Sequence, residues 1–192
     1  MHNYNEFIDW VDFEKWSSVC SEVFSAKILN QSSNRMTKEK WILAGLELSN
    51  TAKNIQWVDV QDYDLIFNDW ELGKVEVKTG NTPLFSSVKC LPKKIINIKL
   101  KNTYDNKNDN IELDKEFDHL MIVNLHPVFC IAFCDFTMAN KYLVPLKDGF
   151  LTRIPFDELT IVYKEPSKLG VDTKINFDPK SVILGQLKKA GY

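Results

Sequence analysis

Arginine and long apolar runs are scarce in this 192-residue chain. Only Arg35 and Arg153 are arginine among the 24 basic residues, so lysine carries almost all of the positive charge. The longest uninterrupted apolar run, 128–134, is far below the roughly 18 residues that a membrane-spanning helix needs. Residues 1–6 carry neither the positive region nor the apolar core of a secretory signal. We therefore expect a cytoplasmic protein with no membrane span.

Paired cysteines are missing as well, which argues against a zinc site. There is no Cys-x-x-Cys pair, and the chain holds only three histidines. Cys130 and Cys134 should share one face of a strand, where we interpret them as small buried apolar residues. His119 and His126 flank a buried strand and are interpreted as structural rather than as a catalytic histidine–metal pair. All four cysteines, Cys20, Cys90, Cys130 and Cys134, are expected to lie in apolar surroundings as reduced structural thiols.

The composition, with 44% apolar and 26% charged residues, is that of a globular chain able to bury a core. Apolar residues at helical spacing predict an amphipathic helix over 6–29, broken once, and a second helix over 37–49. A short helix should begin at Asp178. Segments rich in aromatic and β-branched residues predict strands, whereas segment 84–101 could be helix or strand. The predicted strands are 56–60, 63–67, 72–77, 120–125, 128–133 and 142–146.

These elements predict one α/β domain, because no repeat and no long linker divides the chain. Residues 1–50 would form a helical N-terminal part, 55–146 the sheet, and 147–192 a C-terminal extension. The segments 120–125 and 128–133 are apolar almost throughout, which is typical of strands covered on both faces.

The near-neutral net charge of −2 conceals an uneven distribution. Residues 77–104 contain no acid at all, whereas residues 105–118 are dominated by acids. Such a basic block can neutralise phosphate groups of a nucleic acid, or it can be a solvated surface. Its lysines are Lys78, Lys89, Lys93, Lys94, Lys99 and Lys101.

One acid–x–lysine triplet stands out by its context. The chain contains four such triplets, and three of them lie in polar or proline-containing segments. Only Glu76-Val77-Lys78 lies inside a predicted strand. Because side chains alternate along a strand, Glu76 and Lys78 would share one face while Val75 and Val77 point toward the core.

Asp64 precedes Glu76 across a polar turn, so the two segments should form an antiparallel hairpin. If a three-residue loop joins them, the numbers of paired residues add up to 140 and Asp64 lies opposite Glu76. A two-residue loop would instead place Asp64 opposite Val75, on the wrong face unless a bulge at Gly73 restored it.

Two adjacent carboxylates with a lysine nearby suit phosphodiester hydrolysis. Asp64, Glu76 and the backbone carbonyl of Val77 offer hard oxygen ligands to Mg²⁺, which keeps several waters and binds substrate phosphate. The metal would lower the pKa of the attacking water and neutralise charge on the phosphate. Lys78 would orient or deprotonate that water, or stabilise the developing charge.

These residues resemble the PD-(D/E)XK nuclease superfamily, which includes most type II restriction endonucleases and many repair and recombination nucleases. The resemblance covers the helix 37–49, the hairpin with Asp64 and Glu76-Val77-Lys78, and the apolar strand introduced by Phe117-Asp118. It implies a restriction-endonuclease-like fold with a mixed central sheet flanked by helices. In family terms Asp64 and Glu76 match the metal-binding acids, and Lys78 matches the catalytic lysine.

The chain departs from the family pattern at two places. Tyr63 stands where the motif name has proline. Many members also carry a helix glutamate near the site, and Trp41 aligns with that position, so Glu39 and Glu47 are only displaced candidates for an auxiliary role.

The sequence thus predicts a Mg²⁺-dependent DNA endonuclease that cuts duplex DNA, with site-specific cleavage and a homodimer implied by the resemblance. Lys89, Lys93, Lys94, Lys99 and Lys101 would contact DNA phosphates. The alternatives are a repair, junction-resolving, mobile-element or RNA-cleaving nuclease, or an inactive nucleic-acid-binding module. In a non-catalytic interpretation, Asp64 caps a turn while Glu76 and Lys78 form the polar face of a half-exposed strand.

Overall fold

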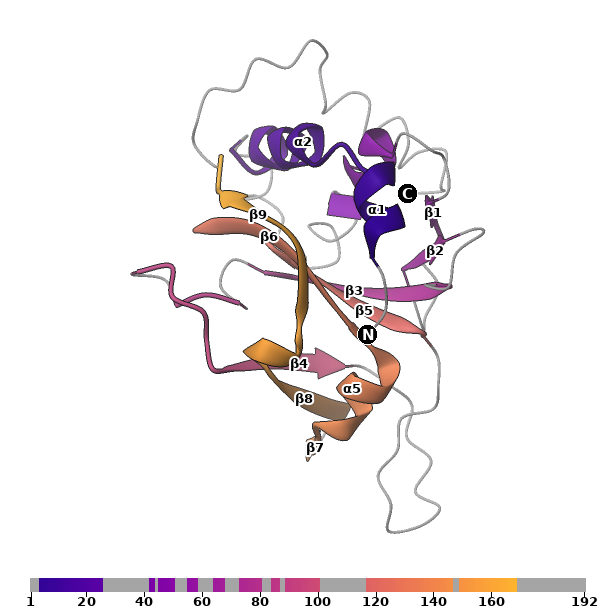
Figure 1. The fold of residues 1–192 in the computed structure, drawn as a ribbon, viewed down its shortest axis with the longest axis vertical. Coiled ribbons are helices and arrows are strands. Elements are labelled where there is room, and N and C mark those ends of the chain that lie inside the picture. Colours follow the sequence, from indigo (N-terminus) through magenta and orange to yellow (C-terminus); the bar gives the residue numbers. More distant parts are fainter. Residues whose placement is uncertain are drawn as a thin grey trace.

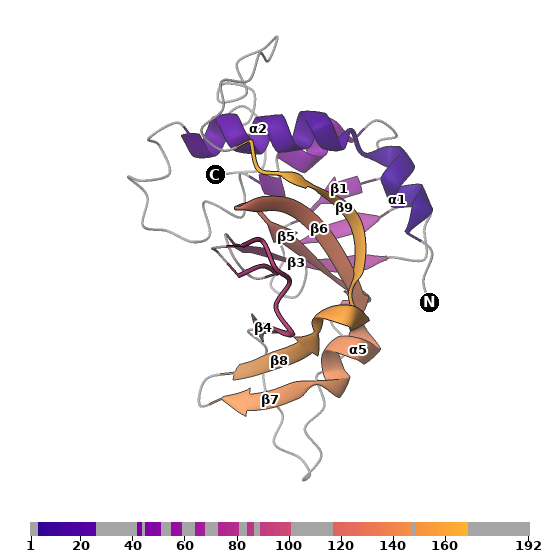
Figure 2. The ribbon, with the colours of Figure 1, turned by 60° about the vertical axis from the view of Figure 1, so that its left-hand side comes forward.

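The structure is a computed structural model that describes residues 4–25, 42–43, 45–50, 55–58, 64–67, 73–80, 84–86, 89–100, 117–146 and 149–168. Within these residues the chain is an α/β protein with a mixed six-stranded sheet and a second sheet of three strands. Helices cover one face of the large sheet, and the small sheet packs against the other face (Figure 1). A second view shows the same three layers (Figure 2).

The N-terminal helices are α1 (Asn5–Trp10) and α2 (Phe13–Ser25). Val11 is extended between them and forms a β-bridge with Asn50. The Asp12 carboxylate then accepts a hydrogen bond from the Lys15 backbone N–H at 2.9 Å, which caps the new helix. The single break predicted within 6–29 is therefore confirmed. None of the helices in the part of the chain that the structure describes has the length and apolar character needed to cross a membrane.

A further helical segment comprises residues 42–43 and 45–49. It agrees with the helix predicted over 37–49 and ends where that prediction ends. Residues 37–41, which include Trp41 and Glu39 and with which the predicted helix begins, lie outside the described residues. The helix predicted from Asp178 also lies outside them.

The large sheet has the strand order β1-β2-β3-β5-β6-β9. Its one parallel pair is β3 with β5, and the other neighbours run antiparallel. The strands are β1 (Ile55–Trp57), β2 (Leu65–Phe67), β3 (Lys74–Gly80), β5 (His119–Asn124), β6 (Val128–Asp135) and β9 (Thr160–Pro166). Every residue of β5 is buried, and so is almost all of β6, which confirms the prediction of strands covered on both faces.

The small sheet has the order β4-β8-β7. Its strands are β4 (Ile95–Leu100), β7 (Leu143–Leu146) and β8 (Gly149–Pro155), and α5 (Phe136–Lys141) leads from β6 into β7. Buried and exposed residues alternate strictly along β4, because one face packs on the core and the other faces away from it. The undecided segment 84–101 thus contains a strand, preceded by a turn that a bridge between Phe85 and Pro92 closes.

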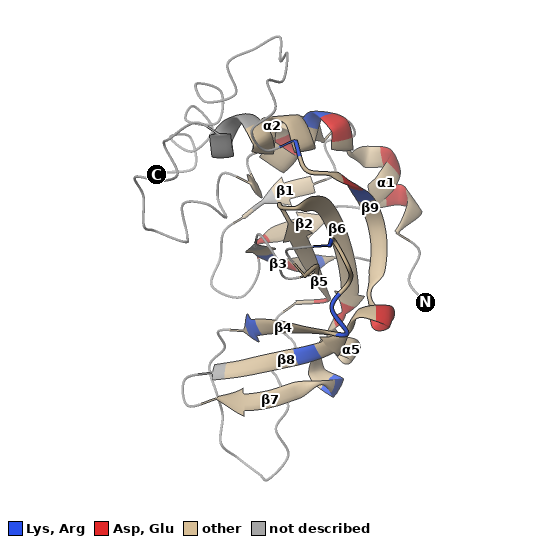
Figure 3. Ribbon diagram, turned by 90° about the vertical axis from the view of Figure 1, so that its left-hand side faces the viewer, with Lys and Arg blue, Asp and Glu red and all other residues tan. Residues whose placement is uncertain are grey.

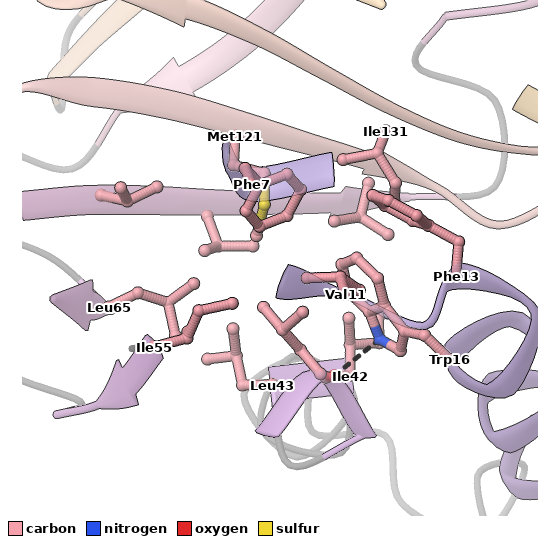
Figure 4. Close-up of a cluster of buried hydrophobic side chains, with 14 of the residues drawn as sticks. Phe7, Val11, Phe13, Trp16, Ile42, Leu43, Ile55, Leu65, Met121 and Ile131 are labelled. Carbon is pink, nitrogen blue, oxygen red and sulfur yellow. Dashed lines mark hydrogen bonds between the residues drawn. The ribbon is translucent and has the colours of Figure 1, made fainter. Parts of the chain in front are cut away.

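Two apolar clusters hold the layers together, one on each face of the large sheet. In the first, α1 and α2 pack on alternate residues of β3, β5 and β6, and Trp16 donates a hydrogen bond to the Ile42 carbonyl at 3.2 Å (Figure 4). In the second, the inner face of β4 and β8 packs on the intervening residues, such as Leu120 and Ile122. β5 and β6 bury apolar residues on both faces, whereas β3 contributes Val75 and Val77 to the first cluster only and is held beside β5 by its parallel pairing.

Candidate active site

The β2–β3 hairpin has the register that places Asp64 next to Glu76. Leu65 pairs with Val75, and Ile66 pairs with Lys74, so the numbers of paired residues add up to 140. The prediction made for a three-residue loop is therefore confirmed in its register, and the register of a two-residue loop is excluded. Residues 68–72, which lie between the two strands in the sequence, are outside the described residues.

Alternation along β3 separates the core residues from the charged ones. Val75 and Val77 are fully buried in the first cluster, under the helices. Glu76 and Lys78 are paired in register with Leu120 and Ile122 of β5, which belong to the second cluster. Paired residues of neighbouring strands share a face, so both charged side chains lie on the face that carries the small sheet.

The carboxylate of Asp64 binds to the backbone of β3. Its Oδ2 accepts a hydrogen bond from the Val77 N–H at 2.8 Å, while its own N–H donates to the Val75 carbonyl at 3.0 Å. The backbone carbonyl of Asp64 also accepts a hydrogen bond from the N–H of Val58, the residue after β1, at 3.0 Å. Three hydrogen bonds therefore fix Asp64 just before the start of β2, beside the middle of the Glu76–Lys78 triplet.

Lys78 bridges two of the predicted oxygen ligands. Its ammonium donates a hydrogen bond to the Glu76 carboxylate and lies 3.4 Å from the Val77 carbonyl oxygen. The side chains of Lys78 and Glu76 are only 18% and 15% exposed. A charge pair so shielded from solvent interacts more strongly than a surface pair, and it is costly to leave one member without the other.

The residues present fit a hard divalent cation with few protein ligands. Asp64 approaches the N–H of Val77, Glu76 is the preceding residue, and a cationic group already contacts the Glu76 and Val77 oxygens. Among the described residues, no group of three or more His, Cys, Asp or Glu side chains is arranged to hold a metal. A site with two carboxylates suits Mg²⁺, which retains water ligands, better than Zn²⁺, which takes a closed set of protein ligands.

Asp118 is an anchoring residue whose role the sequence did not reveal. Its Oδ2 accepts from the Lys74 N–H at 2.9 Å, and its own N–H donates to the Lys74 carbonyl at 2.8 Å. Gly73 precedes this contact with a φ of +52°, and a Cβ there would lie 2.4 Å from the same Oδ2. Asp118 therefore ties the start of β5 to the start of β3, and only glycine leaves room for it. In the sequence, the only sign of this contact was Gly73, a glycine directly before the predicted strand.

Of the two auxiliary candidates, the structure describes only Glu47. Glu39 lies outside the described residues. Glu47 is exposed on the helical segment 45–49, whose buried residue Leu46 packs in the first cluster. That helix covers the face of the sheet opposite to Glu76 and Lys78.

Four of the five predicted DNA-binding lysines are described, and they lie on or just before the small sheet. Lys89 is in the turn that precedes β4, Lys93 and Lys94 follow that turn, and Lys99 projects from the exposed face of β4. Lys101 lies outside the described residues. No ion pair with a described acid involves any of the four described lysines, unlike Lys78, Lys141 and Lys168.

Histidine and cysteine contribute nothing to the candidate site. His119 is buried on the helix-covered face, where its Nδ1 lies 3.3 Å from the Tyr4 hydroxyl. Burial raises the pKa of the Tyr4 hydroxyl, and the nearby Cys134 and Asp135 raise it further. His126 is exposed and precedes Pro127 in a cis peptide bond.

All four cysteines are free, and three of them are buried. Cys130 and Cys134 share the face of β6 that packs in the second cluster, as predicted. Burial raises the pKa of the Cys130 thiol to about 12. The prediction of apolar surroundings is wrong for Cys90, which is exposed in the turn before β4 with a φ of +50°.

No family model, curated protein or solved structure matches this chain. A functional assignment therefore depends on the chemistry of the β2–β3 hairpin itself. That hairpin brings together two acids, one lysine and a backbone carbonyl beside a buried apolar core. Charged side chains are costly to shield from solvent in such a position unless they are paired.

Proposed function

We propose that the protein is a Mg²⁺-dependent DNA endonuclease with a site built from Asp64, Glu76 and Lys78. The observation that carries this proposal is the hydrogen bond from the Val77 N–H to Asp64, which brings the Asp64 carboxylate to the strand that holds Glu76 and Lys78. A turn cap would need only a neighbouring backbone N–H, whereas Asp64 bonds to the next strand at the middle of the charged triplet.

Each residue of the site has a distinct task in phosphodiester hydrolysis. Asp64, Glu76 and the Val77 carbonyl would hold the metal, which supplies Lewis-acid neutralisation of the phosphate and a more acidic bound water. Lys78 would orient that water or stabilise the negative charge that develops on the phosphate. Since Lys78 already contacts Glu76, its ammonium stays beside the acids rather than in bulk solvent.

The arrangement of strands supports a restriction-endonuclease-like fold as part of this proposal. The β2–β3 hairpin is followed by β5, an apolar strand that begins after Phe117-Asp118 and lies beside β3. A helical layer packs on the face of β3 opposite to the charged residues. These are the parts of the chain that the resemblance to PD-(D/E)XK nucleases covers.

Incubation of the protein with supercoiled plasmid DNA tests the proposal. We expect nicking and linearisation in Mg²⁺, and none in EDTA or in Ca²⁺. Parallel incubations with single-stranded DNA, RNA and branched DNA separate the nuclease classes, and sequencing of the DNA ends separates site-specific from non-specific cleavage. DNA binding without cleavage in any divalent metal would identify an inactive binding module and contradict the proposal. Sedimentation velocity measures whether the active species is a homodimer.

A further inference from the structure

The outer face of the β4-β8-β7 sheet carries exposed residues on the side that points away from the second cluster. Its inner face is buried, with Ile96 paired to Ile154 and Leu100 paired to Phe150. The outer face carries the alternate residues of β4, where Asn97 and Lys99 are exposed and Ile95 is 50% exposed. A sheet with one packed face and one open face is available to a partner.

Arg153 lies at the centre of this face and is held in place by Asn97. The two residues are directly opposite each other on β8 and β4, and the Arg153 Nε donates a hydrogen bond to the Asn97 side-chain oxygen at 3.4 Å. The backbone N–H of Arg153 also donates to the Tyr142 carbonyl, which fixes the strand at this point. The bond to Asn97 uses only one of the five guanidinium donors, so the planar end of the side chain remains available.

The cations of this outer face form no ion pair among the residues that the structure describes. Arg153 and Lys99 on the outer face, with Lys94 just before β4, make no ion pair with any acid that the structure describes. Glu158, in the short helix after β8, is engaged with Tyr142 and Lys141. Figure 3 shows the acidic positions of α1 and α2 at the opposite end of the molecule from β4, β7 and β8.

We propose that the outer face of the β4-β8-β7 sheet binds the sugar–phosphate backbone of duplex DNA, with Arg153 as a phosphate contact oriented by Asn97. The choice of DNA as the partner rests on the proposed function. Charge complementarity supports it, because unpaired cations on an open sheet face match a polymer of closely spaced phosphates. Arginine suits this position because its fork can donate two parallel hydrogen bonds to one phosphate.

The surface differs from the catalytic face in position and in chemistry. Glu76 and Lys78 lie on the large sheet and face the small sheet, whereas Asn97 and Arg153 lie on the side of the small sheet that points away from the core. Contacts at Arg153 therefore hold DNA without touching the reacting phosphate. Because they read the backbone, they position the duplex and carry no sequence preference of their own.

Binding of random-sequence duplex DNA in EDTA tests the inference without any need for metal or cleavage. Replacing Arg153 by Gln should lower the affinity and flatten the slope of log affinity against log salt by about one. Replacing Asn97 by Ala removes no charge, so the slope should stay as in the wild type while the affinity falls about two- to fivefold. Arg153→Lys should retain the slope with weaker binding. The matched control, Lys15→Gln, removes one charge on α2 and should change neither quantity.

An unchanged slope in Arg153→Gln would overturn the inference, and so would an equal loss of slope in Lys15→Gln. If Arg153→Gln sediments differently from the wild type while its DNA binding is unchanged, this face is a contact between copies of the chain. That result would also overturn the inference. Thermal melting followed by circular dichroism verifies that each variant is folded. If the plasmid is never cut but the slope falls in Arg153→Gln, the nuclease proposal fails while this surface stands. If the plasmid is cut but the slope is unchanged in Arg153→Gln, the nuclease proposal stands while the DNA-binding surface is contradicted.

Discussion

The Asp64 carboxylate accepts a hydrogen bond from the backbone N–H of Val77 at 2.8 Å, so one oxygen of a predicted metal ligand also helps to hold the β2–β3 hairpin. Asp64→Asn keeps an oxygen that can accept this bond, whereas Asp64→Ala leaves the Val77 N–H without it. We expect both variants to lose cleavage. Only Asp64→Ala should also lose stability, by about 1 kcal/mol.

Urea unfolding followed by circular dichroism measures this difference. Asp135 offers a matched control, because its carboxylate also accepts a backbone N–H, from Met138 at 2.7 Å, but lies at the start of α5. Asp135→Ala should cost similar stability and leave cleavage of the remaining folded protein intact. If Asp64→Asn cleaves DNA at the same rate as the wild type, the assignment of Asp64 to the active site is wrong.

Gly73 should tolerate no side chain as long as Asp118 is present. Alanine at this position would adopt an unfavourable positive φ and would place its Cβ 2.4 Å from the Asp118 Oδ2, which the Lys74 N–H holds in place. We expect Gly73→Ala to destabilise the protein by about 2 to 4 kcal/mol, since strain and overpacking add.

A double-mutant cycle separates the two causes. In an Asp118→Ala background the clash disappears, and Gly73→Ala should cost only about 1 kcal/mol for its backbone conformation. If the cost is the same in both backgrounds, Asp118 does not restrict Gly73. Chemical denaturation of the four proteins supplies the required free energies of unfolding.

The described lysines of the basic block should contribute to DNA binding in proportion to their number. Replacing Lys93, Lys94 and Lys99 by Gln removes three cations that pair with no described acid. The slope of log affinity against log salt should flatten by about two to three, because each neutralised phosphate contributes about 0.9. Filter binding of random and defined duplexes in Ca²⁺ measures this slope.

The same triple variant should lose affinity for random and defined duplexes alike, since phosphate contacts do not read sequence. A loss confined to one sequence would instead show that these lysines contact bases. An unaltered slope would place the DNA elsewhere on the molecule.

Thiol chemistry should distinguish Cys90 from the other three cysteines. Cys90 is exposed, whereas Cys20, Cys130 and Cys134 are buried and burial raises the pKa of each of their thiols. The reactive form is the thiolate, and raising the pKa lowers its population at neutral pH. A disulfide reagent at pH 8 should therefore modify one thiol rapidly in the native protein. Cys90→Ser should abolish this fast phase, and a fast phase that persists would contradict the burial of the others.

The sequence carried enough information for the candidate site but not for the second layer. Residue spacing predicted that Asp64 pairs with the strand of Glu76, but it left two registers open, one for each loop length. The pairing of Leu65 with Val75 in the structure decides between them. Continuous apolar runs likewise identified β5 and β6, because both faces of these strands are covered. The side-chain direction of Val75 and Val77 followed from the same alternation.

The β4-β8-β7 sheet was not predicted as a layer, although the strand predicted over 142–146 agrees with β7 (Leu143–Leu146). Segment 84–101 was left open between helix and strand, and no strand was predicted where β8 lies. Along β4 the buried apolar residues alternate with the exposed residues Ile95, Asn97 and Lys99. Because exposed Ile95 is itself apolar, the alternation of apolar and polar residues is hard to recognise in the sequence. Its partner β8 lies far along the chain, beyond β5 and β6, and local patterns carry no information on such pairs. The roles of Asp118 and Asn97 depend on these tertiary contacts, so they too became visible only in the structure.

Cleavage of supercoiled plasmid by Lys78→Met in Mg²⁺ tests the central claim most directly. Lys74 offers a matched control, because it lies on the same face of the same strand but is exposed. We expect the wild type and Lys74→Met to cut at similar rates, and Lys78→Met to cut at least about a hundredfold more slowly while binding DNA normally in Ca²⁺. Cutting by Lys78→Met at the wild-type rate, or cutting by the wild type that survives EDTA, would contradict the account.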